Sequence, residues 1–154
     1  MTLHFAYGSN MSRALMRVHA RHARPLGTAV LDHWRFIITA DRYASVVPAP
    51  GRAVHGVLWR LTPRDLASLN AYESVDSGLY RGRMLTVRSG GLRVAALVYV
   101  GRSRAEGRPS PGYRETVLAA AREWNLPDDY LGMLARWQPS EYKGTRAAES
   151  GEIA

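Results

Sequence analysis

Glu73 has a sequence context that favours acid–base chemistry. A capping-box pattern over residues 62–65 predicts a helix that ends near residues 70–72, which places Glu73 at the negative end of that helix. A carboxylate is disfavoured there, and partial burial beside Tyr72 and Tyr80 adds a desolvation cost. We therefore expect the pKa of Glu73 to rise toward the range of a general base. For Glu73 taken alone, an ordinary exposed loop glutamate is the more common case.

A second candidate for chemistry is the segment Tyr7-Gly8-Ser9-Asn10-Met11, which is predicted to turn from a strand into a helix. Gly8 allows the backbone to approach a ligand, and amides ahead of a helix N-terminus suit a carboxylate or an oxyanion. On these residues alone, a tight turn followed by a helix cap is the simpler interpretation. The segment is not a Walker loop, because the Lys-Ser/Thr ending is absent.

Other residue types give weaker signals. His19 and His22 are three positions apart on a predicted helix, but no HExxH pattern or clear third ligand accompanies them, so metal binding is a minor alternative. Ser9 lacks a GxSxG context, and no Ser-His-Asp triad can be identified by spacing. The chain has no cysteine, which excludes disulfides, thiolate metal sites and cysteine nucleophiles. Cofactor-free acid–base chemistry remains open.

We expect an α+β fold to position these residues. Strands are predicted at residues 3–7, 27–31, 35–39 and 54–61, followed by a hairpin at residues 84–88 and 92–100. Helices are predicted at about residues 12–22, 62–72, 113–124 and 127–137. Residues 48–51 read Pro-Ala-Pro-Gly and are predicted as a loop. Because the strands come in adjacent runs, we predict a mixed, largely antiparallel sheet that curls toward a small barrel with flanking helices.

Length and charge set the class of protein. The 154 residues suit one domain, predicted at residues 1–144, with a flexible tail at 145–154. No apolar run reaches membrane-spanning length and no signal peptide is evident, so we expect a cytoplasmic protein without membrane contact. The net charge of +8 would suit nucleic acid, but the basic residues are spread along the chain and only Lys143 is a lysine. This pattern indicates a codon-usage bias, so nucleic acid is not the expected partner.

Together these segments resemble the γ-glutamylcyclotransferase family, whose fold is shared with AIG2-like plant proteins. The resemblance covers nearly the whole chain. Its most specific feature is the pairing of the Tyr-Gly-Ser-Asn turn with Glu73 and the Ser-Gly-x-Tyr sequence that follows. The segments that carry it are Phe5-Ala6-Tyr7-Gly8-Ser9-Asn10-Met11, His55-Gly56-Val57-Leu58-Trp59, residues 69–80, Pro109-Ser110-Pro111-Gly112-Tyr113 and Trp137-Gln138-Pro139-Ser140-Glu141-Tyr142-Lys143-Gly144.

The resemblance implies an enzyme that converts a γ-glutamyl amide into 5-oxoproline and a free amine or amino acid, with Glu73 as its single acid–base residue. The implied substrate-binding residues are those of the turn at residues 7–11, together with Tyr80 and Tyr113. The sequence looks closest to the branch that acts on γ-glutamyl amino acids and dipeptides. Neither a metal nor an organic cofactor is implied. Since relatives are often dimers, a homodimer is a candidate assembly.

Two departures from the family pattern bear on these expectations. Ser74 stands where a glycine is common in the family, which bears on the geometry of the loop after Glu73, and a shortened connection across residues 41–53 could reshape the acceptor side of the pocket. Two alternatives stay open. One is a γ-glutamylamine or pathway-specific cyclotransferase that uses the same Glu73, and the other is a non-catalytic binding module that uses its arginine-rich surface.

Overall fold

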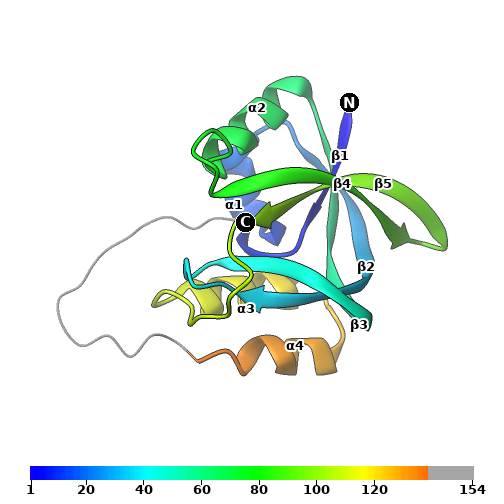
Figure 1. The fold of residues 1–154 in the computed structure, drawn as a ribbon. Helices are drawn as coiled ribbons and strands as arrows, with labels where there is room; N and C mark the ends of the chain where they lie inside the picture. The colour runs from blue at the N-terminus through cyan, green and yellow to red at the C-terminus, as the bar shows by residue number, and fades with distance from the viewer. Residues whose placement is uncertain (139–154) are drawn as a thin grey trace.

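Residues 1–138 are described by the computed structural model, in which five strands close into a barrel (Figure 1). The barrel order is β1-β3-β2-β4-β5, and β1 and β5 close it through a parallel pairing of His4 with Leu97. The other strand pairs are antiparallel, so the predicted α+β class with a mixed, largely antiparallel sheet is confirmed. The tail predicted at residues 145–154 lies outside the described residues. The strands are β1 (Thr2–Ala6), β2 (Arg24–Ile38), β3 (Ala44–Leu61), β4 (Tyr80–Ser89) and β5 (Leu92–Gly101).

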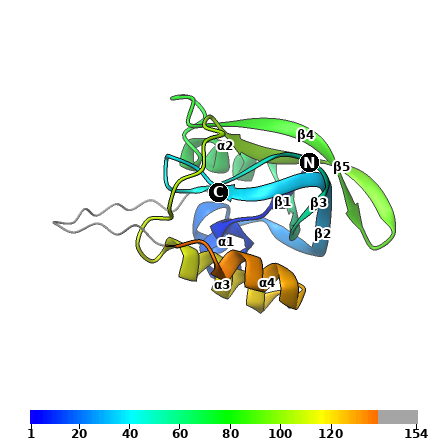
Figure 2. The ribbon, with the colours of Figure 1, turned by 60° about the horizontal axis from the view of Figure 1, so that its bottom comes forward.

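The helices pack on the outside of the barrel in two groups. Helix α1 (Arg13–His19) contacts α2 (Pro63–Tyr72), while α3 (Tyr113–Glu123) and α4 (Asp128–Ala135) lie side by side on another part of the surface (Figure 1, Figure 2). A short 3-10 helix, η1 (Ser9–Met11), precedes α1 and contacts α3, so the turn after β1 lies between the two groups. Within residues 1–138, none of the helices combines the length and apolar character needed to cross a membrane.

The starts of α1 and α2 follow the sequence signals. Ser12 caps α1 by accepting a backbone N–H hydrogen bond at 3.2 Å. Thr62 and Asp65 form the predicted capping box, in which each side chain accepts a hydrogen bond from the backbone N–H of the other. The predicted end of α1 was wrong, because the helix stops at His19 and the backbone N–H of His22 donates to the Asp65 carboxylate at 3.1 Å.

The predicted loop at residues 48–51 is wrong, because β3 continues through this segment. The pairing with β2 shifts its register between Asp32 and Trp34. His33, between them, has a φ of 70° and accepts a hydrogen bond from the N–H of Gly51 at 3.2 Å. Both prolines of the segment are exposed at this irregularity. A strand tolerates proline where regular pairing is interrupted, which the composition of the segment did not reveal.

The hairpin of β4 and β5 is confirmed. Its turn residues Gly90 and Gly91 have φ values of 57° and 85°, the conformation that a two-residue hairpin turn requires. The strands predicted at residues 27–31 and 35–39 instead form a single long β2, which absorbs the irregularity at His33 without ending.

The core fills the barrel and the space beneath the helices. Its fully buried members include Phe5, Met16, Leu31, Ile38, Val57, Leu69, Val98 and Leu134. A smaller set of polar side chains is equally buried, which requires hydrogen-bond partners or a function. This set comprises His4, Ser9, Asn10, Thr39, Ser45, Asp65 and Glu73.

Candidate functional site

Glu73 is fully buried at the C-terminal end of α2. Its backbone N–H completes the last helical turn by donating to the carbonyl oxygen of Leu69 at 2.8 Å. The chain then leaves the helix through Ser74, whose φ of 57° turns it toward β4. The sequence predicted this position at the helix end, but burial is complete where it predicted partial burial.

The turn after β1 brings Asn10 to Glu73. Asn10 Nδ2 donates to Glu73 Oε2 at 3.4 Å, joining the two segments that the sequence singled out. Met11 N–H donates to the carbonyl of Gly8, so residues 9–11 form a single 3-10 turn. The amides at the start of such a turn have no acceptor within it. Ser9 Oγ is buried and has no hydrogen-bond partner among residues 1–138.

Four tyrosines from different parts of the chain lie close enough to Glu73 for its charge to affect them, and two of them, Tyr7 and Tyr99, line the cavity beside it. Their hydroxyl groups are held by neighbouring polar atoms, which fixes the rings: Tyr7 donates to the carbonyl of Tyr99 at 2.6 Å, Tyr80 donates to the carbonyl of Ala44, Tyr99 donates to Asn70 Oδ1 at 2.6 Å, and Tyr113 accepts from the N–H of Ala44 at 3.3 Å. The protons of Tyr7 and Tyr80 thus point to the backbone in this structure. The two residues shape the walls of the site.

Burial is the main influence on the pKa values of these tyrosines. Burial raises the pKa values of Tyr7, Tyr80 and Tyr113 well above the usual 10.0, and the nearby Glu73 charge raises them further. The same two causes raise the pKa of Tyr99. All four phenols therefore stay neutral at physiological pH.

A narrow cavity, too small to hold a water molecule, adjoins Glu73 and is bounded by residues of β1, by Tyr7 and by Tyr99. His4 lies at this cavity, with Nδ1 3.2 Å from the carbonyl oxygen of Leu97. Burial lowers the pKa of His4 to about 4, so its ring is neutral at pH 7 and donates through Nδ1. The surroundings of Glu73 thus combine neutral polar groups with the apolar side chain of Phe5.

The site residues predicted from the sequence do not all contact Glu73. Met11 is fully buried, and its carbonyl accepts the indole N–H of Trp124 at 2.7 Å, so its contacts link the turn to α3. Gly8 precedes the 3-10 turn and accepts a backbone hydrogen bond from Met11. Glu73 and Asn10 meet directly, whereas Tyr80 and Tyr113 are joined through the backbone of Ala44.

Two residues at the site were not assigned to it from the sequence. Tyr99 lies in β5 within an apolar run, and no local signal distinguishes it from core. His19, considered only as a metal ligand, instead places Nδ1 2.8 Å from Asn10 Oδ1 and stacks on Tyr72. In the described part of the chain, neither His19 nor His22 belongs to a group of three or more side chains that could hold a metal ion.

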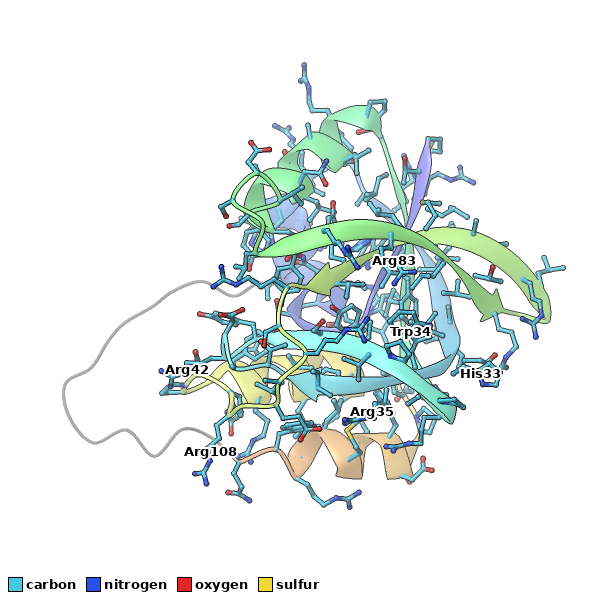
Figure 3. The ribbon with its side chains drawn as sticks, viewed as in Figure 1. His33, Trp34, Arg35, Arg42, Arg83 and Arg108 are labelled. Carbon is cyan, nitrogen blue, oxygen red and sulfur yellow. The ribbon has the colours of Figure 1, made fainter. Side chains whose placement is uncertain are left out.

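The arginine-rich surface is broken up by ion pairs and ring contacts. Figure 3 shows Arg35 and Arg83 near Trp34, and Arg42 and Arg108 farther to the left in the view. Arg35 pairs with Glu106 at 2.8 Å, and the guanidinium of Arg83 lies 5.5 Å from the centre of the Trp34 ring. Further pairs join Arg13 to Glu123, Arg88 to Asp32, and Arg102 to Asp41. The positive charge is therefore locally offset at many points of the surface.

The arrangement around Glu73 is suited to proton transfer beside a negatively charged group. Glu73 is a buried carboxyl group, and a positioned carboxyl group is one of the groups that general acid–base catalysis uses. The amides at the start of η1 can hold a carboxylate or a developing oxyanion nearby.

Comparisons with known proteins agree on one family. A family model described as AIG2-like family matches residues 53–134. The gamma-glutamylcyclotransferase of Mus musculus is 30% identical, with 98% of this chain and 86% of the relative covered, and that of Homo sapiens is 28% identical with the same coverage. A solved structure named gamma-glutamyl cyclotransferase superposes with a TM-score of 0.85 at 26% identity, covering 95% of this chain and 93% of the other.

Proposed function

Because the chain belongs to the AIG2-like family, we propose that it is a γ-glutamylcyclotransferase in which Glu73 moves the protons of the reaction. The observation that carries this proposal is the complete burial of Glu73 against Asn10 of the turn after β1. Burying a carboxyl group carries a desolvation cost. A chemical role would account for keeping one here beside the turn, and the names of the relatives supply the reaction.

The reaction is an internal cyclisation of the γ-glutamyl group. Glu73 accepts a proton from the α-ammonium group, and the freed amine attacks the γ-carbonyl carbon to form a five-membered ring. The amide C–N bond then breaks, and Glu73 returns a proton to the departing nitrogen. The ring nitrogen loses two protons in total and the departing nitrogen gains two, so one carboxyl group acting alternately as base and acid is sufficient. The products are 5-oxoproline and a free amine or amino acid.

Holding the substrate is the main demand on the remaining residues, because nucleophile and electrophile belong to the same molecule. We assign the backbone amides of residues 7–10 to the α-carboxylate or to the oxyanion formed during attack. Tyr80 and Tyr113, fixed on either side of Ala44, serve as rigid walls of the pocket. Burial raises the pKa values of both phenols, so the two walls are neutral at pH 7.

The substrate class that we propose is a γ-glutamyl amino acid or dipeptide. The shared name of the mouse and human relatives, which align along 98% of this chain, supports a γ-glutamyl substrate, and the amino acid or dipeptide leaving group rests on the family resemblance of the sequence. A γ-glutamylamine or pathway-specific cyclotransferase would use the same Glu73 and differ in the leaving group. Comparing leaving groups therefore separates these cases.

The test is to incubate the purified protein with γ-glutamyl amino acids, γ-glutamyl amines and glutathione, and to quantify 5-oxoproline by mass spectrometry. Wild type should release it, Glu73→Gln should not, and the matched surface variant Glu123→Gln should behave as wild type. Glu123 is paired with Arg13 at the surface and has no role in the proposed reaction. Absence of 5-oxoproline across the whole panel would contradict the proposal and favour a non-catalytic role.

A further inference from the structure

His19, the last residue of α1, contacts both segments that form the site. Its Nδ1 atom lies 2.8 Å from Oδ1 of Asn10, in the turn after β1. Its ring also stacks on the ring of Tyr72, with centroids 3.7 Å apart and planes inclined by 25°. Tyr72 directly precedes Glu73 in the chain. One side chain therefore touches the turn and the residue next to the proposed acid–base group.

Two hydrogen bonds, His19 to Asn10 and Asn10 to Glu73, link His19 to Glu73, and their donors and acceptors follow one consistent direction. An ionised Glu73 carboxylate can only accept, so Asn10 must present its Nδ2 donor to it. The Asn10 oxygen then faces His19, and Nδ1 of His19 must carry the proton that it receives. With the amide reversed, an oxygen would face the carboxylate and repel it. The proton on Nδ1 thus determines which Asn10 atom faces Glu73.

The protonation state of the His19 ring agrees with this direction of hydrogen bonding. Burial lowers the pKa of His19 below its usual 6.5, so the ring is neutral at pH 7 and has one N–H group. The short contact with Asn10 places that group at Nδ1, and the stacking on Tyr72 restrains the plane of the ring.

We propose that His19 is a positioning residue that holds the Asn10 amide so that its Nδ2 donates to Glu73, and that fixes the end of α2 against the turn. The inference rests on the proposed function of Glu73. His19 acts through Asn10 and Tyr72, and transfers no proton to the substrate.

Three variants test the proposal through kinetics. His19→Ala should lower kcat about 10-fold with KM near that of wild type, because the proton-moving group is misaligned while substrate contacts remain. His19→Asn places an amide donor close to the position of Nδ1 and should recover most of the loss. His22→Ala, in an exposed neighbour on the same segment, should behave as wild type. A His19→Ala enzyme with unchanged kcat, or one that His19→Asn does not rescue, would overturn the inference.

The pH profile supplies a readout that a loss of stability alone would not change. Losing the Asn10 donor removes a hydrogen bond that favours the ionised Glu73, so the acidic limb of kcat should move up by about 0.5 to 1 pH unit in His19→Ala. An acidic limb that does not move contradicts the proposal. His4, with its pKa of about 4, is present in every variant. Burial raises the pKa values of the tyrosines that the charge of Glu73 affects, which keeps them neutral; they are Tyr7 just after β1, Tyr80 in β4, Tyr99 in β5 and Tyr113 in α3.

A direct observation of the ring separates this inference from the proposed function. Nitrogen NMR of the histidine rings at pH 7 should show the Nδ1–H form for His19 and its loss in His19→Ala. The Nε2–H form would overturn the proposal whatever the activity. If wild type makes no 5-oxoproline, the proposed function fails while the NMR result still decides the positioning. If Glu73→Gln is inactive and His19→Ala is fully active, only the positioning fails.

Discussion

The two ends of α2 each bury a carboxyl group, and their surroundings differ in nearly every respect. Asp65 is in the first turn, where it accepts backbone N–H hydrogen bonds from Thr62 at 3.0 Å and His22 at 3.1 Å. It also lies at the positive end of the helix dipole. Glu73 lies at the negative end, near neutral phenols, with the Asn10 amide at 3.4 Å. One carboxylate is stabilised by its position, and the other is placed where its charge is disfavoured.

This difference separates Asp65, a carboxyl group with a structural role, from Glu73, a candidate acid–base residue. Asp65 contributes through the backbone hydrogen bonds that fix the start of α2. Glu73 is buried at the negative end of the same helix and accepts a hydrogen bond from the neutral Asn10 amide. The comparison predicts that changing Asp65 affects stability and that changing Glu73 affects turnover.

Glu73→Gln should give the largest effect. Removing the acid–base group should lower kcat at least about 100-fold, because general acid–base catalysis typically contributes that much or more. The melting temperature should stay the same or rise, since a neutral amide is less costly to bury than a carboxylate. The measurements are 5-oxoproline release and thermal unfolding. A folded variant that retains its kcat would break the contrast between the two ends of α2.

His4 tests whether the cavity beside Glu73 excludes charge. Burial lowers the pKa of His4 to about 4 in the folded protein, against 6.5 in an unfolded chain. Between these values the unfolded state binds more protons, so stability is complete above pH 6.5 and falls as pH drops toward 4. The loss is roughly 3 kcal/mol over that window. Urea unfolding between pH 7 and 4.5 measures it. His4→Gln should show a shallower slope, and an equal slope would contradict a neutral cavity.

Asp65→Asn should lower stability by about 2 kcal/mol, because the carboxylate oxygens that serve two backbone donors are replaced by one weaker acceptor and an amide donor. Denaturant unfolding measures the change. The folded fraction should keep a kcat close to that of wild type, which is the opposite of the pattern expected for Glu73→Gln. A kcat loss without a stability loss would assign Asp65 a role at the site.

Sequence reasoning succeeded where the structure is decided within a few residues. The capping box at Thr62 and the turn at Gly90 and Gly91 satisfy backbone groups locally, and so they could be predicted from spacing alone. The position of Glu73 followed from the predicted end of α2. The proposed pairing of this residue with the turn at residues 7–11 came from a family resemblance, since the two segments are far apart in the chain.

Sequence reasoning failed where tertiary contacts decide the outcome. The prolines in residues 48–51 argued against a strand, but Pro48 still pairs with Trp34 at the edge of the register shift, and Pro50 lies in the stretch 49–52 that has no partner in β2. Tyr99 reads as an ordinary strand residue until its carbonyl and hydroxyl are seen to hold Tyr7 and Asn70. The sequence shows the spacing of His19 and His22, but it does not show the contacts of His19 with Asn10 and Tyr72. Contacts of this kind depend on the closure of the barrel.

Ser74→Gly should give the smallest effect and test whether the loop after Glu73 is strained. Ser74 has a φ of 57°, in the left-handed region that costs a side chain about 1 kcal/mol and costs glycine little. Glycine also gains freedom in the unfolded chain, so the net stabilisation should be about 0.5 kcal/mol. Because the backbone already follows the path that glycine favours, kcat should not change. Thermal unfolding and 5-oxoproline release measure both quantities. A large gain in kcat would mean that Ser74 holds Glu73 away from its best position, and that the negative end of α2 is tuned by its loop as well as by its neighbours.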